Sequence, residues 1–197
     1  MTIAPALARL ITPVIQAGVG GDSILDVGSG GGLVATSIAL GDRRTVVGID
    51  PSGSQVRRMW RQARHDPQVW PVRGRAESLP FGEDSFDSVY SSCAWKHWPD
   101  PAVGLAECVR VTRPGGALLV IEIDGASTIE EFRRFAREAR IPFGLRDAYV
   151  RFAMRTVVGV APDLTALTTS FEGLSVCLPV VTRMGELPFL VASTIVL

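Results

Sequence analysis

The stretch Ile24-Leu25-Asp26-Val27-Gly28-Ser29-Gly30-Gly31-Gly32 places four glycines directly after a short apolar run that carries one acidic residue. Glycine tolerates positive φ and has no Cβ, so a strand can turn sharply into a helix while its amide groups face a ligand. In open parallel sheets, ligands bind at the carboxyl ends of strands. The stretch therefore predicts a strand, a cradle for a nucleotide-like cofactor, and a helix. A tight connection without a ligand is the alternative at this point.

The spacing of the glycines bears on which cofactor fits. A dinucleotide-binding fingerprint would have glycines at positions 28, 30 and 33, but the chain has Leu33 there and its third glycine is Gly32. The spacing therefore weakens an NAD(P)-dependent oxidoreductase, which we keep as an alternative function.

The composition bounds the class of protein. With 197 residues and 47% hydrophobic content, the chain is long enough for one well-buried domain. Its 20 basic and 20 acidic residues cancel, so the charge balance does not indicate a nucleic acid or an anionic membrane as a partner. We expect a cytoplasmic protein without a membrane partner, either a monomer or a homodimer.

The cysteines are Cys93, Cys108 and Cys177, which are widely separated and lack metal-ligand spacing. We expect buried free thiols and no metal site.

Strands and helices are expected to alternate along the chain. After the first strand, further strands are expected at 45–50, 69–72, 85–91 and 117–123. Helices are expected at 33–40 and around two apolar stripes, formed by Val56, Met59, Trp60 and Ala63 and by Ala102, Leu105, Ala106 and Val109. This alternation predicts a parallel sheet with helices on both faces.

The two ends of the chain frame this core, and we expect residues 1–197 to form a single domain. Residues 1–22 are expected to form a covering helix. Residues 124–172 are too long for one crossover helix and hold two helical patterns, so we expect a helical insertion or lid. Residues 173–197 hold two strand patterns at hairpin spacing, which predicts an antiparallel pair.

Several further motifs follow the glycine turn in a set order. They are Val47-Gly48-Ile49-Asp50-Pro51-Ser52, Gly74-Arg75-Ala76-Glu77-Ser78-Leu79-Pro80-Phe81, Ser85-Phe86-Asp87-Ser88-Val89, His97-Trp98-Pro99-Asp100-Pro101 and Arg113-Pro114-Gly115-Gly116. With these motifs, residues 24–123 resemble class I S-adenosylmethionine-dependent methyltransferases of the ubiquinone/menaquinone-biosynthesis subfamily (methyltransferase type 11).

The resemblance implies both a fold and an activity. The fold is α/β and Rossmann-like, a seven-stranded, mostly parallel sheet with an antiparallel last strand and helices on both faces. The implied cofactor is S-adenosyl-L-methionine, and the implied reaction is in-line methyl transfer to a small-molecule acceptor.

The resemblance also implies cofactor-binding residues. Asp50 ends the second strand, where its carboxylate can accept hydrogen bonds from a ribose diol, although a solvated strand-end residue or helix cap is the alternative. Asp26 is expected near the methionine end, or else it caps the turn. The full expected set is Asp26, Gly28, Ser29, Gly30, Gly32, Asp50, Pro51, Arg75, Ala76, Glu77, Ser91 and Ser92.

Arg75 departs from the family pattern. Relatives usually have an aspartate there that accepts from the adenine amino group, whereas an arginine side chain only donates. Glu77, a backbone carbonyl or water replaces that contact, or Arg75 stacks on the base or is simply solvated, or cofactor binding is weak. The last case motivates a second alternative function, a nonenzymatic cofactor-binding or regulatory domain.

On the acceptor side, His97 matches the family position just after the fourth strand. As a neutral imidazole it is a candidate general base, or else it orients its loop. Candidate substrate contacts are Trp95, Lys96, His97, Tyr149 and Phe152, with core packing or solvation as the alternatives. The other histidine, His65, is expected at the surface or as a helix cap.

Overall fold

The structure is a computed structural model that describes residues 4–42, 44–64, 67–185 and 187–197, so the expectation for His65 lies outside the described residues. Within these ranges seven strands form one sheet in the order β3-β2-β1-β4-β5-β7-β6. The strands are β1 Ser23–Val27, β2 Thr45–Asp50, β3 Val69–Arg73, β4 Phe86–Ser92, β5 Thr112–Ile123, β6 Val180–Arg183 and β7 Phe189–Ile195. The first five are parallel, and β7 lies antiparallel between β5 and β6. The predicted Rossmann-like sheet is therefore confirmed.

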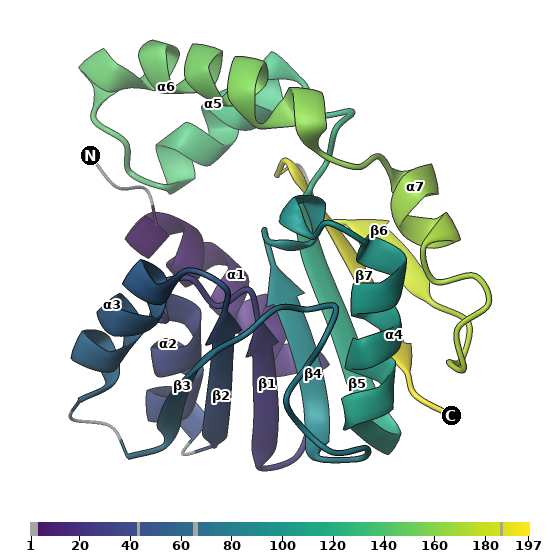
Figure 1. Cartoon of the computed structure of the whole chain (residues 1–197). Coiled ribbons are helices and arrows are strands. Elements are labelled where there is room, and N and C mark those ends of the chain that lie inside the picture. The colour runs from purple at the N-terminus through teal and green to yellow at the C-terminus, as the bar shows by residue number, and fades with distance from the viewer. Residues whose placement is uncertain (1–3, 43, 65–66, 186) are drawn as a thin grey trace.

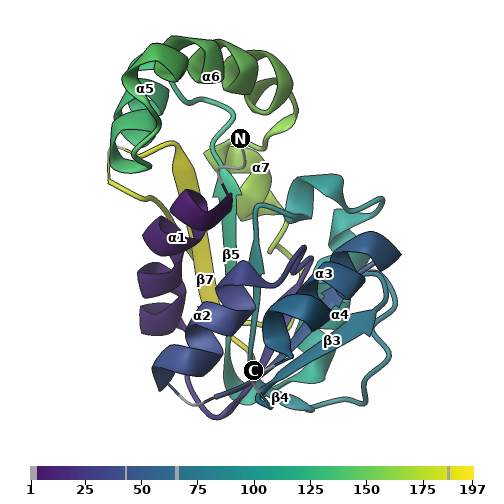
Figure 2. The ribbon, with the colours of Figure 1, turned by 90° about the vertical axis from the view of Figure 1, so that its left-hand side faces the viewer.

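The helices lie on both faces of the sheet and beyond its carboxyl edge (Figures 1 and 2). They are α1 Ala4–Gly18, α2 Leu33–Asp42, α3 Gly53–Ala63, α4 Pro101–Val111, α5 Ile129–Glu138, α6 Phe143–Thr156 and α7 Leu164–Thr169, with short 3-10 helices η1 Trp95–His97 and η2 Val158–Val160. In Figure 1 the parallel strands β1 to β5 point upward, and α5 and α6 lie above their carboxyl ends.

Two apolar clusters hold these layers together, because side chains alternate between the faces of each strand. Ile24 and Leu119 belong to the cluster under α1, α2 and α3, which continues into α5 and α6. Leu25 and Leu118, one position away on the same strands, belong to the cluster under α4 and α7. Strands β1 and β5 are therefore buried on both faces, as their apolar runs predict.

Helices α5 and α6 lie in the segment predicted as a helical insertion or lid, and an ion-pair junction ties them to the sheet. Thr128 and Glu131 form a reciprocal capping box that starts α5. The Arg183 guanidinium, on β6, contacts the buried Asp124 carboxylate at 2.7 Å and Glu131 at 2.9 Å. The last antiparallel hairpin thus holds the first helix of the lid in place.

Two predicted helical stripes are partly wrong. Trp60 is 53% exposed, because Met59 is the residue of that turn that fills the space beside Gly32 and Gly48. In α4 the buried stripe is Gly104, Leu105, Cys108 and Val111, while Ala106 is exposed. Gly104 is buried because the Trp98 ring packs where its Cβ would stand.

The C-terminal region departs from expectation in three places. Cys177 is exposed, although all three cysteines are free as expected. The strand expected over 174–182 is shorter in the sheet, beginning at Val180 directly after Pro179, which has no amide hydrogen for a ladder. Helix α7 was not predicted, because its six residues show too little periodicity to stand out.

Candidate functional site

The glycine turn is tied to the end of β2 by three backbone donors. The amides of Gly28 and Ser29 both donate to the Ile49 carbonyl oxygen, at 2.9 and 3.0 Å. The Gly30 amide donates to Asp50 Oδ2 at 3.0 Å. The turn and the Asp50 carboxylate therefore form one rigid unit at the carboxyl edge of the sheet.

Two of the glycines are required for different geometric reasons. Gly28 has φ +80°, and a Cβ there would lie 2.3 Å from the Ala94 Cβ. Gly30 has φ +55°, yet an added Cβ would meet no atom within 4 Å. The first glycine thus allows close packing of two turns, and the second presents open backbone to a ligand.

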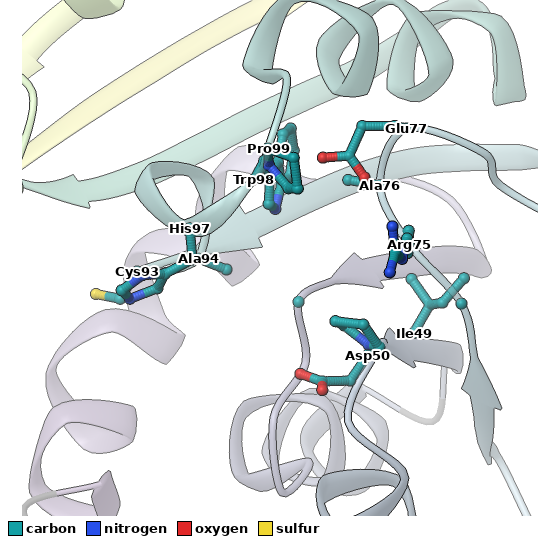
Figure 3. A pocket seen from close by; sticks show the side chains of 13 residues that line it. Ile49, Asp50, Arg75, Ala76, Glu77, Cys93, Ala94, His97, Trp98 and Pro99 are labelled. Atoms are coloured by element: carbon teal, nitrogen blue, oxygen red, sulfur yellow. The ribbon is translucent and has the colours of Figure 1, made fainter.

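A cavity of about 320 Å³ opens beside this turn (Figure 3). In Figure 3 the side chains of Asp50, Arg75 and Glu77 lie on one side of the space and those of Cys93 and His97 on the other. The lining residues are Gly28, Ile49, Asp50, Pro51, Gly74, Arg75, Ala76, Glu77, Cys93, Ala94, His97, Trp98 and Pro99. Four segments that are far apart in the sequence therefore converge at the carboxyl ends of β1, β2 and β4 and on the segment after β3.

A second hollow of about 210 Å³ lies on the other side of the same turn. It is lined by Ser29, Gly30 and Ser92 of the predicted cofactor set, and Gly28 borders both spaces. Of the remaining predicted cofactor residues, Asp26, Gly32 and Ser91 line neither space. Gly32 instead faces the core, where its Cβ would lie 2.4 Å from Met59 Cγ.

Asp50 retains capacity to bind a ligand. Its Oδ1 accepts from the Ser52 amide at 2.8 Å and its Oδ2 from the Gly30 amide. Each carboxylate oxygen can accept more than one hydrogen bond, so a diol can still donate to both. The unfilled acceptor capacity of Asp50, the open backbone of Gly30 and the adjoining cavity fit an adenosyl cofactor.

Asp26 is fully buried beneath the turn rather than on the cavity wall. Among the described residues its two carboxylate oxygens have no hydrogen-bond partner. Burial raises the pKa of this carboxyl to about 7, the nearby Tyr90 hydroxyl lowers it, and the negative charge of Asp50 raises it further. Tyr90 stands beside Asp26 in the register of β1 and β4. The Asp26 carboxyl therefore titrates near neutral pH.

The loop after β3 supplies the third wall of the cavity. Arg75 is exposed there, and its carbonyl oxygen accepts from the Ser78 amide at 3.3 Å. Glu77 Oε1 accepts from the Asp100 amide at 3.4 Å, which connects this loop to the start of α4. Ala76 between them is buried. The three predicted adenine-side residues therefore lie together at the cavity.

The turn after β4 separates the predicted acceptor residues. His97 is exposed and lines the cavity, whereas Trp95 packs in the core under α4. The Lys96 ammonium is turned away from the cavity and paired with Glu122 Oε1 at 2.5 Å, with the side chains 5% and 0% exposed. Burial raises the pKa of the Cys93 thiol to about 12, Glu122 adds to this and Lys96 opposes it. Cys93 therefore presents a neutral thiol to the cavity.

The lid contributes only one of its two predicted residues near this turn. Tyr149 is partly buried, with its ring 6.0 Å from that of Phe135. Burial, followed by the nearby Cys93, raises the pKa of Tyr149 to about 12. Phe152 is 61% exposed and borders a separate hollow on α5 and α6 with Arg133 and Arg151.

Sequence reasoning missed several functional residues. Cys93, Ala94 and Pro99 line the cavity, and Pro99 belongs to a motif quoted above, so its position in that motif was an available signal. Glu122 is the one carboxylate in the otherwise apolar run 117–123. Because charged side chains are rarely buried unpaired, that position alone indicates a partner nearby.

None of the described helices combines the length and hydropathy needed to cross a bilayer. No group of three or more His, Cys, Asp or Glu side chains in the described ranges is arranged to hold a metal ion.

Comparison with known proteins gives the family. Residues 25–120 match a family profile described as a methyltransferase domain. The chain is 33% identical over 169 residues to a demethylmenaquinone methyltransferase of Mycobacterium sp. (strain JLS), covering 79% of this chain and 68% of the relative. It is 34% identical over 116 residues to the enzyme of that name from Clavibacter sepedonicus, covering 59% of this chain and 47% of the relative, so it spans about half of that relative's length.

Solved structures agree on the fold. A SAM-dependent methyltransferase from Aquifex aeolicus superposes with a TM-score of 0.72 at 15% identity, over 98% of this chain and 92% of that one. With the match to its relatives and the glycine turn joined to Asp50, the chain belongs to the class I S-adenosylmethionine-dependent methyltransferases of the menaquinone-biosynthesis type, and its cofactor is S-adenosylmethionine.

Proposed function

We propose that this chain transfers a methyl group from S-adenosylmethionine to a small, uncharged and largely apolar acceptor by in-line displacement. The observation that carries the proposal is the shared cavity, in which the cofactor motifs and the turn that bears His97 form opposite walls. A donor and an acceptor held across such a space react with an advantage of about 7–11 kcal/mol over free reactants, so a dedicated base is optional. We further propose that residues 1–197 act as one methyltransferase domain.

Four of the predicted residues have proposed tasks. The cofactor supplies a methyl group activated on a positively charged sulfur. Asp50 accepts hydrogen bonds from the ribose hydroxyls, the Ala76 amide donates to the adenine, and the open backbone at Gly30 lies along the methionine portion. His97 takes a proton from an acceptor hydroxyl when the acceptor needs one removed.

The walls around His97 support an uncharged acceptor. The neutral Cys93 thiol, Ala94 and the Trp98 indole line this end, while the nearby Lys96 charge is neutralised by Glu122. The relatives named demethylmenaquinone methyltransferase act, by that name, on demethylmenaquinone. We therefore propose the hydroquinone form of a short-chain demethylmenaquinone as the first acceptor to test.

A second candidate function is binding of the cofactor without methyl transfer. One solved fold neighbour, with a TM-score of 0.63 and 20% identity, is described as the [4+2]-cyclase SpnF. A fold of this kind therefore does not by itself specify the reaction. The exposed Arg75 at the adenine-side wall, where relatives usually have an aspartate, is the observation that keeps this candidate.

Two measurements separate the candidates. Calorimetry with S-adenosylmethionine, S-adenosylhomocysteine and NAD should show micromolar binding of the first two and none of NAD. Isotope-labelled cofactor is then incubated with the protein and a short-chain demethylmenaquinone reduced to its hydroquinone, alongside amine, thiol and carboxylate acceptors. Label on the hydroquinone supports the proposal. Tight cofactor binding with no label on any acceptor favours the second candidate, and binding of NAD alone contradicts both.

A further inference from the structure

The buried pair formed by Lys96 and Glu122 is the strongest polar contact near the cavity that the proposed function leaves unused. Glu122 lies near the end of β5, and Lys96 lies in η1, directly after β4. Both side chains are almost completely buried, although Lys96 directly precedes the exposed His97 in η1. Burying two charges is expensive, so a pair of this kind is weak support for stability and invites another explanation.

The Glu122 carboxylate contacts both the side chain and the backbone of the turn. Besides its contact with the Lys96 ammonium, it accepts from the Lys96 amide at 3.2 Å and from the Ile123 amide at 2.9 Å. The ammonium in turn donates to the Cys93 carbonyl oxygen at 3.1 Å. The carboxylate thus fixes the turn at Lys96, through both its amide and its ammonium, and the ammonium fixes the turn at Cys93.

The fixed turn carries most of one wall of the cavity. Residues 93, 94, 97, 98 and 99 line the space, while Trp95 and Lys96 between them point into the protein. Cys93 has φ +55°, a left-handed conformation that is strained for a non-glycine residue and that surrounding contacts must hold. Ala94 packs against Gly28 so closely that a Cβ at Gly28 would lie 2.3 Å away.

We propose that Glu122, acting through Lys96, is a positioning residue that sets the turn 93–98 and holds His97 at its distance from the cofactor turn. This inference rests on the proposed function, because it assigns His97 and its neighbours to the acceptor side. Lys96 then serves the site through the backbone it orders rather than by touching the acceptor. A displacement of about 1 Å in such a wall lowers turnover by as much as a hundredfold.

The first test uses the unaltered protein and needs no acceptor. Amide hydrogen exchange is measured by NMR at Lys96 and His97 and compared with core amides of β4. We expect Lys96 to exchange slowly, as a buried hydrogen-bonded amide does. Exchange of the Lys96 amide at the rate of an exposed loop would overturn the proposal, since the turn would then not be held by the carboxylate.

The second test replaces the pair by uncharged side chains of similar volume. Lys96→Met/Glu122→Met leaves no buried charge, and such replacements are often neutral or stabilising. The single variant Glu122→Gln is measured beside it, and Glu130→Gln on α5 is the matched control, because it removes an exposed ion pair with Arg137. Since the chain has two histidines, the His97 imidazole signal is identified by its loss in His97→Gln.

For the double variant we expect an unchanged unfolding temperature, S-adenosylhomocysteine affinity within threefold of the parent, and a shifted His97 signal. We expect kcat to fall by roughly ten- to a hundredfold with the short-chain hydroquinone.

An unshifted His97 signal with kcat within twofold overturns the proposal. So does a loss of cofactor affinity as large as the loss of kcat, because the pair would then shape the cofactor turn. If the parent does not methylate the hydroquinone, the proposed acceptor fails, and the His97 signal still decides the positioning role. If neither variant folds, the exchange rates decide.

Discussion

The cofactor turn and the lid are built on opposite principles, although both border the carboxyl edge of the sheet. In the cofactor turn, backbone amides meet a carbonyl and a carboxylate at hydrogen-bond distances, and Gly28 leaves no room for a Cβ. In the lid, Phe132, Phe135 and Ala136 pack into an apolar cluster, and Phe152 remains exposed. The family profile covers the first region and ends at residue 120, before the lid begins. The structure of the cofactor region therefore requires particular residues at particular positions, whereas the structure of the lid requires only a pattern of apolar residues.

The largest expected effect concerns the protonation of Asp26. Its pKa is raised to about 7 in the folded protein, so between about pH 4 and pH 7 the folded chain binds a proton that the unfolded chain has lost. Stability without cofactor should therefore fall as pH rises through this window, by about 4 kcal/mol in total from this group. Asp26→Asn cannot titrate and should abolish that part of the fall. Urea unfolding of both proteins at pH 5 and pH 8 spans the part of this fall that lies above pH 5, about 2.7 kcal/mol, and two parallel pH profiles would contradict the prediction.

The second expected effect is a substitution within the cofactor turn. Gly28→Ala puts a Cβ at a left-handed residue and against Ala94, so we expect a cost of roughly 2–4 kcal/mol, divided between unfolding and cofactor binding. Denaturant unfolding and calorimetry with S-adenosylhomocysteine give the two parts. A variant with the stability and affinity of the parent would show that the turn can yield, and the contrast with the lid would weaken.

A third prediction concerns the ribose site. Asp50→Ala should weaken S-adenosylmethionine binding by roughly 1–3 kcal/mol, because charge-assisted hydrogen bonds to the diol are lost. The matched lid variant is Asp147→Ala, whose carboxylate is exposed and stands 4.0 Å from Arg133. Calorimetry should show no change for that control. Equal affinities for the two variants would remove Asp50 from the proposed ribose site, provided that circular dichroism shows both folded.

The smallest expected effect is the counterpart of Gly28→Ala in the lid. Gly144 lies in the first turn of α6, and a Cβ there would meet nothing within 4 Å. Gly144→Ala should raise the unfolding free energy by about 0.5–1 kcal/mol, since alanine is the better helix former. The thermal midpoint measures this gain. A loss of stability would show that the lid is as demanding as the cofactor turn.

The same contrast explains how much the sequence predicted. The bounds of β2 were predicted at Thr45 and Asp50, because a buried apolar run ends in a carboxylate and a motif. The antiparallel C-terminal pair was predicted because its connection has hairpin length. Local features of this kind are determined by a few neighbouring residues and can therefore be predicted from the sequence.

What the sequence did not predict depends on neighbours that are distant along the chain. The exposure of Trp60 follows from which side chain fills the space beside Gly32 and Gly48. The partner of Lys96 is 26 residues away on another strand, so nothing near Lys96 indicates that its charge is neutralised. Burial and pairing of this kind depend on the assembled sheet, so predicting them requires the register of its strands.

The junction at Arg183 sets an order for the assembly of the chain. The lid helices leave the ribosome before Arg183 does, and Asp124 and Glu131 have no contact with it until β6 pairs with β7. Because β6 joins the sheet only through β7, this contact also needs the pairing of β5 with β7, which is a long-range pairing of the kind that slows folding. We expect a nascent intermediate in which the sheet through β5 is formed and the lid is still undocked. Its uncovered apolar edge at β5 would be the point at which the unfinished chain is most exposed to aggregation.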